Sequence, residues 1–262
     1  MEFFTSAQGC SLHLSDSQTG EPVLLLLHGY LESLDVWEDF LPLLPASLRI
    51  VCLDLPGHGL SVGRKDVNGM AFSALAIYGA LQSCGVKEAY VCGHSLGCYV
   101  ALEMARQFPD FVQGLALLYG APYADSEERK GEREISAIEK GKLARVAALS
   151  IPKMFAVRRQ KALSEKIEEM IELCEVHEPE GIIACLRGMG ERADHTEFLN
   201  TFAKPLLWIF GKKDRFILEE QAQCILRNFP QGQGILLEGV GHCCFLEEAQ
   251  ATAASIKSWI GV

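Results

Sequence analysis

Short apolar runs alternate with helical patterns along this chain of 262 residues, and this alternation limits its possible folds more than any other feature. The runs are almost wholly apolar, as strands are when both faces of a sheet are buried. They are Val23–Leu27, Ile50–Leu53, Ala89–Cys92, Leu115–Leu118, Leu206–Phe210 and Ile235–Leu237. The helical patterns are near Asp35–Leu44, Met70–Cys84, Cys98–Gln107, Leu218–Asn228 and Glu247–Trp259. Such alternation predicts an α/β fold with a mostly parallel, doubly wound sheet. Two further runs, Glu2–Phe4 and Ser11–Leu14, predict an antiparallel hairpin at one edge.

One stretch, residues 121–202, contains no convincing strand. Its apolar residues follow helical spacing, for example at Ile167 and Met170. We therefore expect residues 1–120 and 203–262 to form the core and residues 121–202 to form an inserted helical lid. A long insertion between two core strands is commonly functional. The alternative is a solvated helical hairpin with no role in the reaction.

The overall charge argues against two classes of partner. With 34 acidic and 24 basic residues the chain carries a formal charge of −10, and its pI is about 5.2. Nucleic acid and anionic membranes would be repelled by such a surface. A small-molecule substrate remains compatible, because the charge within a pocket can differ from the total.

The first basic residue is Arg49, so a secretory signal is not expected and we predict a cytoplasmic protein. The ten cysteines should then be reduced. They form no C-x-x-C pair and no metal-ligand spacing, so neither a metal nor a cofactor is expected. Most should be buried as small apolar residues. Cys243 and Cys244 could pack their loop or line a pocket, and packing is favoured.

The most specific motif is Gly-His-Ser-Leu-Gly at residues 93–97. It follows a predicted strand and precedes a predicted helix, which is the setting of a nucleophile elbow. A serine hydroxyl is a weak nucleophile and needs an exposed, sharp turn that presents it to a base. Gly93 and Gly97 would remove side chains that clash at such a turn. Ser95 is therefore the predicted nucleophile.

A serine nucleophile needs a base, and the base needs an acid that orients it. His242 and Asp214 each follow a predicted strand, as Ser95 does. The carboxyl ends of parallel strands are where open α/β sheets bind ligands. The order Ser95, Asp214, His242 is that of this class of hydrolase. We predict these three residues as the catalytic triad.

Other residues could take these roles. Asp125 also follows a predicted strand and is the alternative acid. His94 is adjacent to Ser95 in sequence and should point elsewhere, so we interpret it as a packing residue. His13, His177 and His195 have no supporting context and are predicted to be surface or lid residues.

Acyl transfer passes through an oxyanion that needs two preorganised donors. One is predicted to be the backbone N–H of Leu96, which follows the nucleophile. The other is predicted to be the N–H of Tyr30, in the loop His28-Gly29-Tyr30 after the first apolar run. The Tyr30 side chain could line the acyl site or pack within the loop.

Together these motifs resemble those of the α/β-hydrolase superfamily, in its lidded esterase-like branch with a serine nucleophile. The residues that carry the resemblance are His28-Gly29-Tyr30, Asp54-Leu55-Pro56-Gly57-His58-Gly59, the 93–97 motif, Gly211-Lys212-Lys213-Asp214 and Gly241-His242. The resemblance implies the catalytic use of Ser95, His242 and Asp214. It also implies that Asp54–Gly59 is a structural turn and that Trp37 is a packing residue.

Membership of a family does not fix a reaction. The preferred interpretation is a carboxylic-ester hydrolase acting on a small-molecule acyl substrate through an acyl-enzyme. Serine at the elbow disfavours dehalogenases and epoxide hydrolases, which carry aspartate there. The alternatives are a carbon–carbon bond hydrolase or menaquinone-pathway-type synthase, a thioesterase, a cofactor-free perhydrolase, and a ligand sensor with slow turnover.

Overall fold

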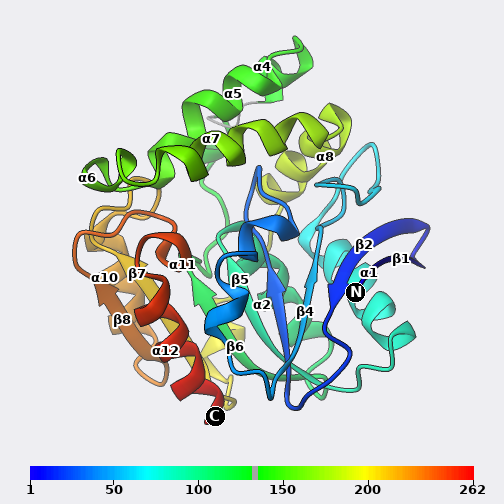
Figure 1. Cartoon of the computed structure of the whole chain (residues 1–262), viewed down its shortest axis with the longest axis vertical. Helices are drawn as coiled ribbons and strands as arrows, with labels where there is room; N and C mark the ends of the chain where they lie inside the picture. The colour runs from blue at the N-terminus through cyan, green and yellow to red at the C-terminus, as the bar shows by residue number, and fades with distance from the viewer. Residues whose placement is uncertain (132–134) are drawn as a thin grey trace.

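The computed structural model describes residues 1–131 and 135–262, and its centre is one eight-stranded sheet (Figure 1). The strand order is β1-β2-β4-β3-β5-β6-β7-β8. The strands are β1 Glu2–Ala7, β2 Cys10–Asp16, β3 Val23–Leu27, β4 Arg49–Leu53, β5 Ala89–His94, β6 Val112–Leu118, β7 Leu206–Gly211 and β8 Gln233–Leu237. β1 and β2 form an antiparallel hairpin that pairs antiparallel to β4, and every pairing from β4 to β8 is parallel. The predicted α/β fold is confirmed.

The burial of the central strands explains why they read as continuous apolar runs. All five residues of β3 and all six residues of β7 are buried. β3 lies between β4 and β5, so its side chains meet packed layers on both faces. Trp208 and Phe210 on β7 stack at 6.0 Å between ring centroids. None of the helices within the described residues is long and apolar enough to cross a membrane.

The core helices follow the predicted positions with two differences. They are α1 Met70–Ser83, α2 Leu96–Gln107, α10 Glu219–Asn228, α11 Cys244–Glu247 and α12 Ala249–Ile260. The last predicted helix is divided at Glu248, where φ is −140°. The predicted helix over 35–44 is wrong, because two short 3₁₀ helices replace it, η1 Leu34–Trp37 and η2 Leu41–Leu43. Pro42 has no N–H for a helical hydrogen bond, and its ring would clash with an α-helical turn before it. Trp37 is fully buried against Phe245, as expected of a packing residue.

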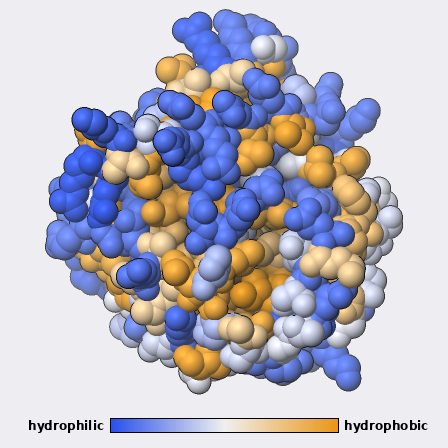
Figure 2. Space-filling model, viewed as in Figure 1, coloured by the Kyte–Doolittle hydropathy of each residue, from blue (hydrophilic) through white to orange (hydrophobic). Residues whose placement is uncertain are grey.

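Between β6 and β7 the chain forms only helices within the described part of residues 121–202. They are α3 Glu127–Gly131, α4 Ile135–Glu139, α5 Leu143–Ser150, η3 Ile151–Met154, α6 Val157–Gln160, α7 Ser164–Leu173, η4 Cys174–Val176, α8 Pro179–Gly190 and α9 Thr196–Asn200. Helices α4 to α8 lie as a layer above one end of the sheet (Figure 1). Hydrophilic residues cover much of the outward surface of this layer (Figure 2).

The three histidines predicted to be surface or lid residues are all buried. The prediction is wrong for His13 in β2, whereas His177 and His195 lie within residues 121–202. Each of these side chains has a polar partner. His13 lies 2.9 Å from a carboxylate oxygen of Asp54. The ring of His177 accepts the Gly59 N–H at 2.8 Å. His195 lies 3.3 Å from Glu103. These partners are distant in sequence, so composition around each histidine could not reveal them.

Candidate active site

The predicted nucleophile lies on a strained turn between β5 and α2. Ser95 is partly exposed and has φ 48° and ψ −108°, which a residue with a side chain adopts only at a cost of about 1–3 kcal/mol. A Cβ atom at Gly93 would lie 2.4 Å from the backbone of Gly97. One at Gly97 would lie 2.3 Å from the carbonyl oxygen of Leu27 on β3. Glycine is therefore required at both positions to bring strand and helix together around the serine.

The predicted base and acid are in direct contact. His242 Nδ1 lies 2.7 Å from Asp214 Oδ2, and both residues are buried. The second oxygen of Asp214 accepts the Phe216 N–H at 2.7 Å, which fixes the carboxylate plane. An ionised carboxylate only accepts hydrogen bonds, so Nδ1 carries the proton and Nε2 is the basic nitrogen. The pair has the geometry of a base with its orienting acid.

The loop that carries His242 is held by the inserted helices. The His242 N–H donates to the carbonyl of Met154 at 2.5 Å. Glu247 accepts the N–H of Gly241 at 2.8 Å and that of Ala156 at 2.9 Å. Burial raises the pKa of Glu247, although the three backbone N–H groups around it and the charge of Arg159 act in the opposite direction. Segment 154–156 of the insert and the base loop therefore share one hydrogen-bond network.

The two predicted oxyanion donors lie at the start of α2 and in the loop after β3. Leu96 is the first residue of α2, and an N–H at that position has no acceptor inside its helix. Tyr30 follows β3, and its neighbour Leu31 has φ 62°. These backbone positions are compatible with the predicted roles, which remain predictions for Tyr30 and Leu96.

The alternative acid, Asp125, has a different partner. Its carboxylate forms a buried ion pair with Arg192. The Arg192 guanidinium also lies over the ring of Tyr99, 4.1 Å from the centroid. Asp125 therefore pairs with a cation of the insert, whereas Asp214 orients His242.

Two residues near the site were missed or underestimated at the level of sequence. His94, interpreted as a packing residue, bonds through both ring nitrogens, to Glu32 and to the His242 carbonyl, each at 2.9 Å. Glu32 is fully buried in the loop after β3. A lone glutamate in a loop gives no sequence signal of burial, because glutamate is usually exposed.

One group of side chains has donor atoms close enough for a metal. Atoms of Glu32, His94 and Cys243 lie within 4.8 Å of one another. However, Glu32 and His94 are hydrogen-bonded to each other, and burial raises the pKa of the Cys243 thiol well above its ordinary value. The donor set therefore fits a hydrogen-bonded cluster better than a metal centre.

The cysteines are mostly packing residues. Eight of the ten are buried, and Cys224 alone is exposed. Cys243 and Cys244 are both fully buried, which agrees with packing of their loop. Burial raises the pKa of Cys244 to about 12, so its thiol is unreactive at neutral pH.

Comparison with known proteins supports this description of the fold. Residues 22–163 match the family model of the alpha/beta hydrolase fold. A curated relative, the pimeloyl-[acyl-carrier protein] methyl ester esterase of Neisseria meningitidis, is 26% identical over 90% of this chain and 91% of its own length. A Pseudomonas 2-hydroxy-6-oxononadienedioate/2-hydroxy-6-oxononatrienedioate hydrolase is 23% identical over 91% of this chain and 88% of its own length.

A solved structure is similar over nearly the whole chain. A thermophilic esterase from Thermogutta terrifontis superimposes with a TM-score of 0.91 and 26% identity, covering 99% of this chain and 98% of that one. The predicted resemblance is thus confirmed for the fold.

Proposed function

The chain belongs to the alpha/beta hydrolase fold family, and on that premise we propose that it is a serine hydrolase that cleaves carboxylic esters of small molecules through an acyl-enzyme. The observation that carries the proposal is the buried Asp214–His242 hydrogen bond of 2.7 Å. It leaves His242 Nε2 as a base. The His242 carbonyl is bonded to His94, the residue before Ser95, so base loop and elbow lie together.

In this mechanism the Ser95 hydroxyl attacks the ester carbonyl while His242 Nε2 takes its proton. Asp214 stabilises the imidazolium that forms and keeps the ring in one tautomer. The N–H groups of Tyr30 and Leu96 stabilise the oxyanion of the tetrahedral intermediate. His242 then gives its proton to the leaving alcohol. A water molecule, deprotonated by the same nitrogen, releases the acid from Ser95.

We assign the choice of substrate to residues 121–202, acting as a lid on the core of residues 1–120 and 203–262. The contact between Met154 and His242 supports this role, because a backbone hydrogen bond joins the insert to the catalytic loop. Lid residues so close to the base would contact the acyl or alcohol part of a small-molecule substrate. We place the enzyme in the cytoplasm, as the reduced, buried cysteines favour.

Hydrolysis of a carbon–carbon bond is the second candidate. It is supported by the Pseudomonas relative, whose name describes a hydrolase of an oxo-acid rather than an ester. The same three residues could serve both reactions, so the site geometry does not separate them. Assays with substrates of each class distinguish the two reactions.

A panel of esters tests the proposal. Purified protein should hydrolyse p-nitrophenyl esters of short and medium acyl chains and react covalently with a fluorophosphonate. Ser95→Ala should abolish both, whereas Ser255→Ala, at a partly exposed position of α12, should change neither. Turnover of a vinylogous oxo-acid without turnover of any ester would favour the carbon–carbon reaction. Labelling that survives in Ser95→Ala would contradict the nucleophile.

A further inference from the structure

One buried carboxylate oxygen connects the loops that make the site. Glu32 Oε2 accepts the Gly29 N–H at 2.5 Å, within the loop that carries Tyr30. The same oxygen lies 2.9 Å from His94 Nδ1, beside the nucleophile. His94 Nε2 in turn lies 2.9 Å from the carbonyl of the base, His242. The oxyanion loop, the elbow and the base loop are therefore joined by three consecutive hydrogen bonds.

The hydrogen-bond acceptors in this network determine which atoms carry protons. The His242 carbonyl can only accept, so His94 Nε2 carries a proton. Burial favours a neutral Glu32, but the His94 ring and the Gly29 N–H outweigh it and lower the pKa of Glu32 below its ordinary value. An ionised carboxylate only accepts hydrogen bonds, so Glu32 Oε2 takes the Gly29 N–H and faces His94 Nδ1. The two buried side chains satisfy each other, as buried polar groups require.

We propose that Glu32 is a positioning residue for the hydrolytic reaction. This inference rests on the proposed function. Glu32 holds the oxyanion loop against the elbow and, through His94, fixes the backbone of His242. The Glu32 side chain touches no reacting atom, so it acts by orienting the oxyanion donors and the base.

We call the two hydrogen bonds of Glu32 Oε2, to Gly29 and to His94, the clamp. Local backbone strain explains why it is needed. Leu31, between Tyr30 and Glu32, has φ 62°, a conformation that persists only where neighbouring contacts hold it. The bond from Gly29 to the Glu32 side chain closes the loop across this residue. A Cβ atom at Gly29 would lie 2.8 Å from Glu32 Oε2 and 2.8 Å from His94 Nδ1, so the clamp also requires glycine there.

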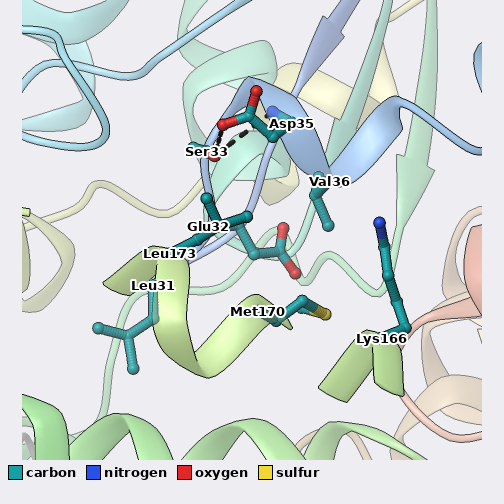
Figure 3. A pocket seen from close by; sticks show the side chains of 8 residues that line it. All are labelled: Leu31, Glu32, Ser33, Asp35, Val36, Lys166, Met170 and Leu173. Atoms are coloured by element: carbon teal, nitrogen blue, oxygen red, sulfur yellow. Dashed lines mark hydrogen bonds between the residues drawn. The ribbon is translucent and has the colours of Figure 1, made fainter. Parts of the chain in front are cut away.

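Glu32 also lines a small cavity. Glu32 Oε1 has no hydrogen-bond partner among the protein atoms described. The cavity has a volume of about 10 Å³, room for about one water molecule. Figure 3 shows the Glu32 carboxylate pointing into it from the loop after β3, opposite Met170 of α7. It is lined by Leu31, Glu32, Ser33, Asp35, Val36, Lys166, Met170 and Leu173. One bound water would satisfy Oε1 and leave Oε2 for the clamp.

Glutamine has nearly the same shape but cannot replace Glu32. An amide oxygen in the place of Oε2 could accept from both donors only if His94 carried a proton on Nδ1 as well as Nε2, which would make it a buried cation without a carboxylate. An amide nitrogen in that place faces the Gly29 N–H, so two donors meet. Glu32→Gln must therefore lose one of the three hydrogen bonds or leave a buried charge unpaired.

The experiment compares Glu32→Gln with Glu103→Gln. Glu103 is the matched control, because it is a second buried glutamate paired with a histidine, His195 at 3.3 Å, on a part of α2 away from the three loops. For p-nitrophenyl ester hydrolysis, Glu32→Gln should lower kcat by on the order of 10–100-fold with KM within about twofold. The rate of fluorophosphonate labelling should fall by the same factor. Glu103→Gln should keep kcat within about twofold.

Wild-type kcat in Glu32→Gln, or an equal loss in Glu103→Gln, would overturn the proposal. If Glu32→Gln does not fold, ¹H–¹⁵N spectra of the Ser95→Ala protein replace it. A proton on His94 Nε2 near neutral pH is the expected result, because this nitrogen faces the His242 carbonyl, and an unprotonated Nε2 would contradict the network. Failure of the proposed function looks different: the wild-type chain would then hydrolyse no ester and not react with the fluorophosphonate.

Discussion

The sheet and the inserted helices are stabilised in different ways. Strands β3 and β7 are buried along their whole length and paired on both sides. The insert consists mainly of short helices, and α5 packs against its neighbours within the insert. It is tied to the core by hydrogen bonds, such as Asn68 N–H to Ala184 and His242 N–H to Met154, and by ion pairs such as Lys166 with Asp39. The core therefore fixes where the proposed catalytic residues lie, and the insert contacts them from outside the sheet.

Substitution of the acid gives the largest expected effect and separates core from insert directly. Asp214→Asn should lower kcat by about 10³–10⁴-fold with little change in fold, because the amide stabilises the wrong His242 tautomer. Asp125→Asn breaks an ion pair with Arg192 of the insert and should act mainly on stability. Ester kinetics and thermal unfolding of both variants check this. The reverse pattern would make Asp125 the acid.

Truncation of one leucine in each region tests the difference in packing. Leu25→Ala on β3 removes a fully buried side chain between two paired strands and should cost about 3–5 kcal/mol. Leu143→Ala on α5, at the edge of the insert and 8% exposed, should cost less, about 1–2 kcal/mol. Urea unfolding measures both. Equal losses would mean that insert and sheet unfold as one equally packed unit.

Acid should weaken the contact between the two regions at His177. Burial lowers the pKa of this ring from 6.5 to about 4, and its Nδ1 accepts the Gly59 N–H. Between pH 4 and 6.5 the unfolded chain binds the proton and the folded chain does not. Stability is therefore lost as pH falls through this window, by about 2 kcal/mol between pH 7 and pH 5.

His177→Gln provides the comparison, because its amide oxygen can still accept from Gly59. Urea unfolding at pH 7 and pH 5 measures how much unfolding free energy each protein loses on acidification. The loss should be about 2 kcal/mol larger in the wild type than in the variant. The buried His58 has a pKa well below 6.5 and contributes with the same sign in both chains. An identical pH dependence in wild type and variant would exclude His177 as its source.

Thiol modification should have the smallest effect. Cys224 is exposed on α10, whereas Cys243 and Cys244 are fully buried beside the base. A thiol-alkylating reagent should modify Cys224 in the native protein without changing kcat, and Cys224→Ser should alter stability by less than about 0.5 kcal/mol. Mass spectrometry locates the adduct. If the reagent still inactivates Cys224→Ser, and if substrate protects the enzyme from this inactivation, a buried cysteine lies in the pocket.

Much of the fold could be predicted because its signals are local. The predicted strand Val23–Leu27 matches β3 residue for residue, since two-sided burial makes a strand continuously apolar. Proline explains the main error: Pro42 divides a helical pattern that otherwise looked continuous. The predicted Asp214 and His242 do meet, because the ends of neighbouring parallel strands β7 and β8 lie at the same edge of the sheet.

The sequence by itself determined the sheet, the strained elbow at Ser95 and the pairing of Asp214 with His242, because periodicity, glycine and chain order report on local backbone and strand ends. Only the tertiary structure decided the partners of buried polar groups. The clamp of Glu32 on Gly29 and His94, the ion pair of Asp125 and the contact of His177 with Gly59 join residues distant along the chain. Such bonds form because burial leaves each polar group in need of a partner, and burial is a property of the folded molecule.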